Sequence, residues 1–220
     1  MSYELLLTLL IEGTRDTLYM VGAASLIAFL IGLPLGVVLS VTSEDGILRS
    51  GPLYNSLSLV VNIGRSAPFV ILMIAVIPLT RLIAGTSIGR TAAIVPLSIA
   101  AIPFVGRVVE SSLREVDRGI IEAAQSMGAT PFEIIYKVLI PEGLPGIIAG
   151  ATLMVISLIG YSAMAGALGA GGLGDIAFRY GYQRFMTNVM IATIIVLVLL
   201  VQIIQLLGDK LASLTRHDRP

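Results

Sequence analysis

The residues Gly119–Pro141, reading GIIEAAQSMGATPFEIIYKVLIP, form the longest polar interruption in an otherwise very apolar chain. We expect Asp117 to cap a short helix, which ends at Gly128 because glycine tolerates the left-handed conformation that terminates helices. Thr130–Glu133 is a capping box with proline at the first helical position. We expect this second helix to stop before the proline that closes the stretch, since proline disfavours helical geometry in the preceding residue. The stretch therefore predicts an elbow of two short helices.

This elbow resembles the EAA loop of bacterial ABC importer permeases. The family pattern is EAA, three residues, glycine, nine residues and I-x-L-P, and here Glu122, Ala123 and Ala124 are followed at those spacings by glycine and by Val138–Pro141. In that family the loop is a coupling helix that enters a cleft of a cytosolic ATPase subunit. The alternative is an amphipathic linker between two membrane spans. The resemblance implies an ATPase interface made by Glu122, Ala123, Ala124, Gly128, Pro131 and Pro141.

The composition of the chain is that of an integral membrane protein. Hydrophobic residues make up 56% of it and charged residues 13%, and the mean hydropathy of +0.95 is far above that of a soluble domain. Fourteen basic residues balance 14 acidic ones, so no overall field points to nucleic acid. The absence of cysteine excludes disulfides and cysteine metal sites. A length of 220 residues suits a single helical membrane domain, 1–220, and we expect no cleavable signal peptide.

Uncharged runs predict an all-α membrane fold with five transmembrane helices, since about 20 residues cross the hydrocarbon core. The segment Ser2–Glu12 is too short to span, and we expect it to lie in the interface or along a neighbouring helix. This is the type I ABC importer permease fold that the resemblance implies. The expected spans are 16–41, 57–80, 91–112, 144–168 and 186–208, with the elbow within the loop 114–142.

The second span carries an arginine in an unusual place. The segment between Arg65 and Arg81 rises only about 22 Å as a helix and cannot cross about 30 Å of hydrocarbon. The helix must then begin near Leu57, which places Arg65 within or just below the apolar layer. Two interpretations stay open: the side chain extends to the headgroups, or it faces a water-filled pathway. The tetrapeptide Arg65–Pro68 also resembles the corresponding span of amino-acid importer permeases.

A glycine-rich segment near the end of the fourth span strengthens the resemblance. Gly160–Gly174 looks very much like its counterpart in methionine importer permeases. Its last part, Gly169–Gly174, matches G-x-G-x-x-G, but a dinucleotide site needs a preceding strand, so we expect a flexible exoplasmic turn. Methionine is the substrate that the resemblance implies, and Met164 suits a thioether, although ordinary packing explains it from periodicity alone. The candidates for a pathway or gate are Arg65, Phe104, Tyr161, Ser162 and Met164.

The distribution of basic residues predicts the orientation. Five spans place the termini on opposite sides, and the side with the elbow carries more Lys and Arg, which places it in the cytoplasm with the C-terminus and leaves the N-terminus outside. The elbow side carries Arg49, Arg107, Arg114, Arg118, Lys137, Lys210, Arg216 and Arg219, and the other side carries Arg15, Arg81, Arg90, Arg179 and Arg184.

Several motifs are missing. Neither lysine follows a glycine, so there is no phosphate-binding loop, and we expect ATP and magnesium to be bound by a partner rather than by this chain. The sole histidine, His217, lies in the tail, where solvation is the simplest interpretation. We also expect spans without Asp, Glu, His or Lys, which argues against an intramembrane enzyme or an ion-coupled carrier. Neither a metal nor a cofactor is expected in this chain.

The sequence thus predicts the permease subunit of an ABC importer in the inner membrane, acting as a homodimer in the lipid bilayer. The expected partners are two copies of an ABC ATPase and an extracytoplasmic substrate-binding protein, and no nucleic acid. One alternative is an ion-independent channel or secondary transporter whose loop is only a linker. A second alternative is a membrane scaffold that transports nothing.

Overall fold

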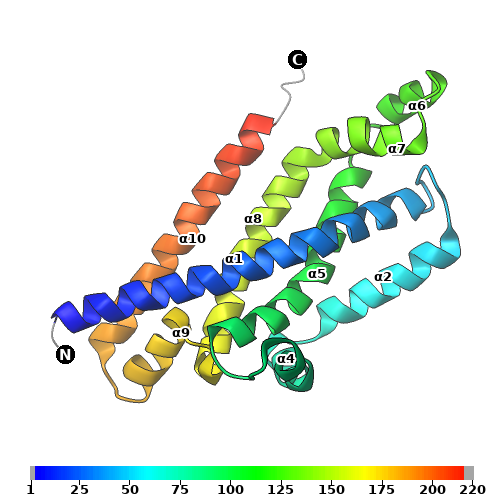
Figure 1. Cartoon of the computed structure of the whole chain (residues 1–220). Helices are drawn as coiled ribbons and strands as arrows, with labels where there is room; N and C mark the ends of the chain where they lie inside the picture. The colour runs from blue at the N-terminus through cyan, green and yellow to red at the C-terminus, as the bar shows by residue number, and fades with distance from the viewer. Residues whose placement is uncertain (1–2, 216–220) are drawn as a thin grey trace.

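The apolar runs fold as helices because lipid offers no partners to backbone N–H and C=O groups, and a helix satisfies them internally. The computed structural model describes residues 3–215, so Ser2, Arg216, His217 and Arg219 lie outside the described residues. Every regular element within 3–215 is helical (Figure 1). The α-helices are α1 (Tyr3–Thr42), α2 (Gly51–Ser66), α3 (Phe69–Ala75), α4 (Ile77–Ala84), α5 (Arg90–Arg114), α6 (Arg118–Ser126), α7 (Pro131–Ile134), α8 (Ile140–Ala165), α9 (Gly172–Ile176) and α10 (Thr187–Thr215).

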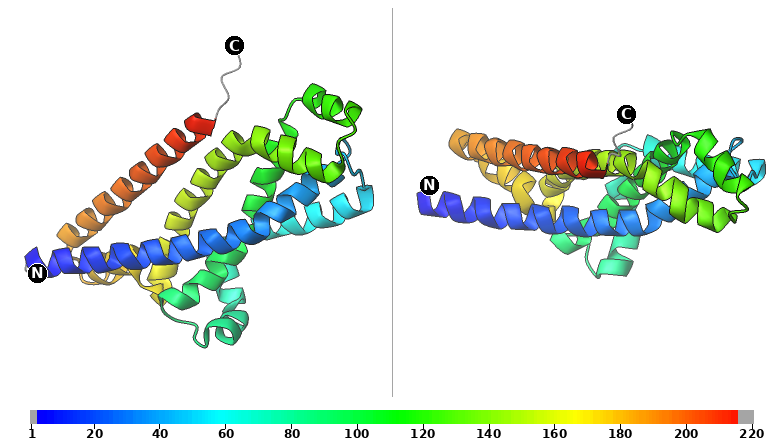
Figure 2. Two further views of the ribbon diagram at one scale, coloured as in Figure 1. Left: turned by 45° about the horizontal axis from the view of Figure 1, so that its top comes forward. Right: turned by 90° about the horizontal axis from the view of Figure 1, so that it is seen from above.

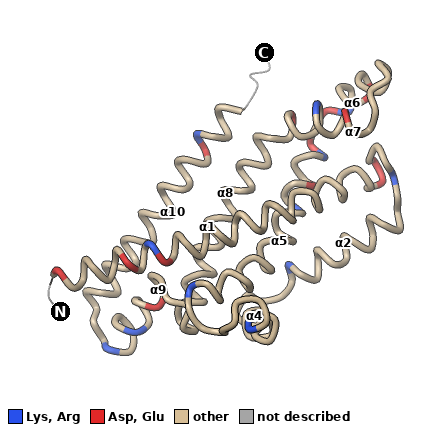
Figure 3. Tube along the Cα trace, in the orientation of Figure 1, with Lys and Arg blue, Asp and Glu red and all other residues tan. Residues whose placement is uncertain are grey.

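Three further stretches are π-helical: Ile135–Leu139, Gly166–Ala170 and Ala177–Tyr182. The elbow of α6 and α7 projects at one end of the molecule, and α4 and α9 lie at the other end (Figures 1 and 2). Charged residues gather mainly towards these two ends, with a largely uncharged zone between them (Figure 3). This separation is the pattern expected of a chain that crosses a bilayer.

Within the described residues four helical runs are long and apolar enough to span a membrane: α1, α5, the run Pro131–Ala170 and α10. A fifth span results if α2 and α3 are counted together, although they meet at a bend of 103°. The predicted span 57–80 is therefore not one continuous helix. Ala67 is extended, with ψ 127°, because Pro68 disfavours helical geometry in the residue before it.

The N-terminal segment is not a separate element. From Tyr3 onwards, the segment expected before the first span is the start of α1, which is one helix of 40 residues. Its first half is anchored by α9: the Leu173 N–H donates to Thr17 Oγ1 over 3.0 Å, and both residues are buried. The extra turns at the start of α1 are stable because α9 packs beside them.

The second elbow helix does not stop before Pro141, contrary to the prediction. The backbone stays helical from Pro131 through Ala165, with a π-helical stretch just before the proline. There the Ile140 N–H bonds to the Ile135 carbonyl five residues earlier, and this wider turn accommodates the proline. The steric preference for a break is overcome because Ile134 and Leu139 are buried.

The glycine-rich segment is not the flexible turn that was predicted. Gly169, Gly171 and Gly172 have positive φ, but residues 172–176 are all buried. A Cβ on Gly174 would lie 2.2 Å from the Ala163 carbonyl oxygen, so the chain is packed tightly against the end of α8.

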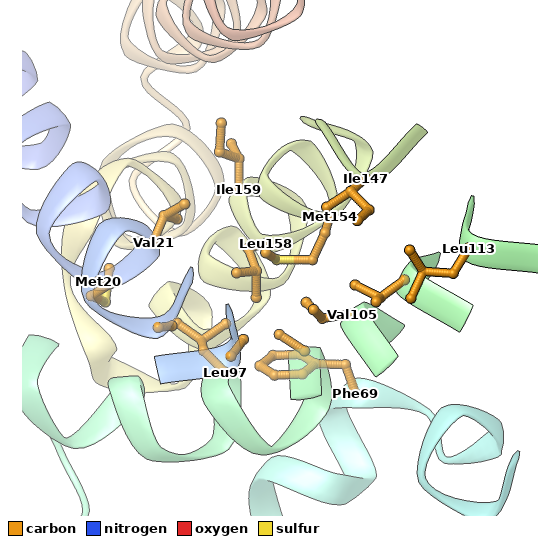
Figure 4. Packing of buried hydrophobic residues seen from close by; sticks show 14 of the residues in the cluster. Met20, Val21, Phe69, Leu97, Val105, Leu113, Ile147, Met154, Leu158 and Ile159 are labelled. Atoms are coloured by element: carbon orange, nitrogen blue, oxygen red, sulfur yellow. The ribbon is translucent and has the colours of Figure 1, made fainter. Parts of the chain in front are cut away.

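Helix α5 lies at the centre and packs chiefly against α1, through glycines. A Cβ on Gly32 would lie 2.6 Å from Val105 Cβ, and one on Gly36 would lie 2.5 Å from the Gly106 carbonyl oxygen. Around this contact a core of buried side chains joins α1, α3, α5 and α8 (Figure 4). Its members include Met20, Val21, Phe69, Leu97, Val105, Leu113, Ile147, Met154, Leu158 and Ile159.

This packing predicts that Gly36→Ala destabilises the protein by about 1–3 kcal/mol, because the added methyl group overpacks the contact. Gly22→Ala on the same helix is the matched control, since a Cβ at Gly22 meets nothing within 4 Å. Thermal unfolding in detergent measures the difference. Equal melting temperatures for the two variants would show that the α1–α5 contact tolerates a side chain.

Candidate coupling elbow and pathway cavity

The elbow is built by local capping, as the sequence predicted. The Gly119 N–H donates to Asp117 Oδ1 over 2.7 Å at the start of α6. Gly128 closes that helix with φ 82°, and the Ala129 N–H bonds back to the Ala124 carbonyl over 3.1 Å. Gly128 is needed for its backbone conformation alone, because a Cβ there would meet nothing within 4 Å.

The capping box of the second helix is also confirmed. The Glu133 N–H donates to Thr130 Oγ1, and the Thr130 N–H donates to Glu133 Oε2 over 3.0 Å. Lys137 Nζ lies 3.0 Å from the other carboxylate oxygen. These donors lower the pKa of Glu133, which lies in the elbow beyond the expected spans, to about 2, first through the Thr130 backbone and next through Lys137. The carboxylate that caps the helix therefore stays ionised at physiological pH.

The elbow presents apolar side chains that the sequence reasoning missed. Met127 is 82% exposed, Phe132 76% and Tyr136 67%, and all three lie on or beside the two short helices. Their signal in the sequence was the amphipathic character of a segment outside the spans. Large exposed apolar side chains on a projection are typical of contact surfaces.

The predicted interface residues divide into two groups. Glu122, Ala123, Gly128, Pro131 and Pro141 are exposed. Ala124 is 6% exposed and belongs to the core cluster, so it anchors α6 rather than presenting a surface.

Three of the predicted pathway residues share a cavity of about 240 Å³ between α2, α3, α5 and α8. The Arg65 guanidinium carbon lies 6.0 Å from the centre of the Phe104 ring, and Tyr161 stacks on Phe69 with ring centres 4.7 Å apart. Met154 and Ser157 complete one wall. The cavity thus combines one exposed cation with aromatic faces, a thioether and a hydroxyl.

The other two candidates lie outside this cavity. Ser162 is 2% exposed, and its hydroxyl donates to the Ile159 carbonyl over 2.8 Å, which is a packing role. Met164 is 48% exposed and lies near the end of α8 that is remote from the elbow.

One charge contradicts the expectation of spans without acidic residues. Glu110 lies in α5 within the predicted span, and its side chain is 2% exposed. Arg107 pairs with it at 2.5 Å, Arg114 lies at 3.7 Å, and the Tyr54 hydroxyl donates to it over 3.1 Å. A buried carboxylate is tolerated when it is paired and hydrogen-bonded in this way. The spacing of Arg107, Glu110 and Arg114 at i, i+3 and i+7 was the signal that could have revealed it.

Comparison with known proteins decides the family. The family model described as "Binding-protein-dependent transport system inner membrane component" matches residues 32–217. The chain belongs to this family. The predicted resemblance and the predicted all-helical permease fold are both confirmed, and the protein is an inner membrane permease component.

Individual relatives show which members of the family this chain resembles in sequence and structure. The chain is 55% identical to the probable D-methionine transport system permease protein MetI of Vibrio cholerae over 95% of this chain and 93% of that one. It is 50% identical to the D-methionine transport system permease protein MetI of Escherichia coli over 74% of this chain and 75% of that one. A solved structure of the MetNI methionine ABC transporter in inward-facing conformations contains a chain with 48% identity and a TM-score of 0.96, covering 99% of this chain and 100% of that chain.

The elbow geometry predicts unequal costs for two substitutions at one position. Gly128→Val should cost about 1–2 kcal/mol or more locally, because a β-branched residue is strained at positive φ. Gly128→Asn should cost much less, since asparagine tolerates the left-handed region. Amide hydrogen exchange within residues 118–134 measures the change, with exchange in α5 as the internal control.

Faster exchange in the valine variant alone is the expected result. Equal exchange in both variants would show that the turn does not depend on the conformation of residue 128.

Proposed function

We propose that this permease forms the membrane pathway of an ATP-driven importer for methionine, with the elbow as its coupling site. The observation that carries the proposal is the elbow itself: a rigidly capped projection with exposed Met127, Phe132 and Tyr136 at one end of the molecule. Support for the substrate comes from relatives named for D-methionine transport and from the likeness to the MetNI methionine transporter.

The arrangement of partners follows from the elbow. A single elbow can engage one ATPase subunit, so two copies of this chain would engage two ATPase subunits. ATP and magnesium would be bound by those subunits, because this sequence has no phosphate-binding loop, and the chain needs no cofactor of its own. The excess of basic residues on the elbow side favours a cytoplasmic elbow and C-terminus with an external N-terminus. Substrate would arrive from an extracytoplasmic binding protein.

The coupling residues would act through a stiff connection. Glu122, Ala123, Gly128, Pro131 and Pro141 would face or shape the ATPase contact, with Ala124 holding α6 in place. Because the helical backbone from Pro131 to Ala165 is continuous, movement of the elbow would pass directly into the span α8. Approach of the two ATPases on binding ATP would then rotate this span as a rigid body, and α8 forms one wall of the cavity.

The cavity has groups that suit methionine. The Arg65 guanidinium would attract the substrate carboxylate, which it can bind through two parallel hydrogen bonds. Phe104, Tyr161 and Met154 would contact the thioether side chain, since sulfur packs favourably against aromatic rings and other polarizable groups. Met164, exposed near the opposite end of α8, would contribute to an external gate, whereas Ser162 would serve packing.

The test is uptake of radiolabelled D- and L-methionine into vesicles that contain the purified permease with the ATPase that copurifies with it, with the substrate-binding protein supplied outside the vesicles. We expect uptake only when ATP is enclosed on the elbow side with the ATPase present. Uptake by the permease alone without nucleotide would instead indicate a channel or secondary transporter. Gly128→Val should lose ATPase binding or stimulation, and Gly128→Asn should retain both.

The cavity predicts that Arg65→Leu lowers methionine uptake about tenfold or more while the complex still assembles, because the carboxylate loses its charged partner. Arg81→Leu is the control: Arg81 is also exposed but lies in α4, away from the cavity. Uptake rate at saturating ATP is the measurement. Normal uptake by Arg65→Leu would assign Arg65 to contact with lipid headgroups.

A further inference from the structure

Helix α2 is held in place by few apolar contacts. Only Val61 is buried among its 16 residues. Its start follows the loop Ser43–Ser50, and its end is the bent joint at Ala67. Hydrogen bonds to a neighbouring helix therefore contribute a large share of what fixes its position.

Those polar contacts come from α5. The Arg107 guanidinium donates to Ser58 Oγ over 2.9 Å and to Asn62 Oδ1 over 2.7 Å, and the Tyr54 hydroxyl donates to Glu110. Tyr54, Ser58 and Asn62 are spaced at i, i+4 and i+8, so they form one stripe on α2. Arg65, which lines the cavity, is less than one further turn along the same helix.

From Glu110, a second set of contacts leads away from α2 and reaches the elbow. Glu110 pairs with Arg107 and lies 3.7 Å from Arg114. Arg114 lies 4.0 Å from Asp45, whose other carboxylate oxygen is 2.8 Å from Arg118, the first residue of α6. Charges of alternating sign thus run from the start of the elbow to the polar stripe of α2.

We propose that this charge chain (Arg118, Asp45, Arg114, Glu110 and Arg107) transmits displacement of the elbow to α2, and that Glu110 is its central positioning residue. The inference rests on the proposed function, because it concerns how that transporter is coupled. Glu110 touches neither the cavity nor the elbow surface; it acts by fixing the Arg107 guanidinium against α2.

The two halves of the chain differ in strength. Glu110 and Arg107 are largely withdrawn from water, so separating them leaves a buried charge unpaired, which is strongly unfavourable. Asp45 is half exposed and is shared between α5 and α6, and exposed ion pairs are weak. The inner half is therefore a fixed joint, and Asp45 is the point where pairing can exchange when the elbow moves.

Two substitutions test the proposal against a matched control. Asp45→Asn removes the exposed link, Glu110→Gln removes the buried one, and Glu44→Gln removes a neighbouring exposed charge outside the chain. In the permease–ATPase complex in vesicles, we expect Asp45→Asn to lower methionine imported per ATP hydrolysed about two- to fivefold. Glu110→Gln should lower it about tenfold or more. Glu44→Gln should leave the ratio unchanged.

A distance measurement separates this inference from the proposed function. The chain contains no cysteine, so spin labels can be placed at Leu59→Cys on α2 and Gln125→Cys on α6, both exposed. The chain that carries the two cysteines is co-expressed with excess cysteine-free chain and labelled after purification, so that each complex carries one pair. We expect a narrow distance distribution with and without bound nucleotide, and a broader one in Asp45→Asn and Glu110→Gln.

Wild-type distributions in both variants, with unchanged import per ATP, would overturn the proposal. Failure of the wild-type complex to import methionine would refute the proposed function, but broadening would still support the mechanical link. If Glu110→Gln does not assemble, the comparison of Asp45→Asn with Glu44→Gln decides the question alone.

Discussion

Lipid chains are as apolar as leucine, so membrane helices must be held together by shape rather than by burial of apolar surface. In this permease that requirement falls on the contact between α1 and α5. Gly32 and Gly36 leave no room for a side chain against Val105, Gly106 and Val109. The close approach fixes α5 at the centre; α5 carries the buried charges, contributes one wall of the cavity and leads into the start of the elbow.

Charged and polar side chains lie where other groups offset the free-energy cost of removing them from water. Glu110 is buried only because Arg107, Arg114 and Tyr54 surround its carboxylate. Arg65 is exposed at the cavity and keeps one face near an aromatic ring. The elbow lies beyond the spans, where charged capping groups are in contact with water. Its exposed apolar side chains are free there to contact another protein. Stability and function therefore use different parts of the same central helix and its extension.

The sequence predicted the features that depend on neighbouring residues. The cap at Asp117, the positive φ of Gly128 and the capping box of Thr130 each follow from backbone chemistry within four residues, and all three are confirmed. The expectations that failed depend on contacts between distant segments. Pro141 does not end its helix because burial of Ile134 and Leu139 favours continuation.

Contacts between distant segments also explain why the buried Glu110 was not predicted and why Ala124, which was expected at the ATPase interface, is buried. Glu110 lies in a span because residues of α2, 45 or more positions away, help to satisfy it and its arginine. Ala124 belongs to the family motif, yet it packs inwards because the elbow folds back onto the core. The bend after α2 was readable in principle from Pro68, but the length needed for a straight span outweighed it in the prediction.

The central claim is that the elbow couples this permease to a separate ATPase. The most direct measurement is the mass and composition of the complex isolated from native membranes through a tag on this chain. The account predicts a complex of two permease chains with two ATPase chains. In Gly128→Val the two permease chains should stay together and the ATPase chains should be absent. A wild-type permease that is recovered without any ATPase would contradict it.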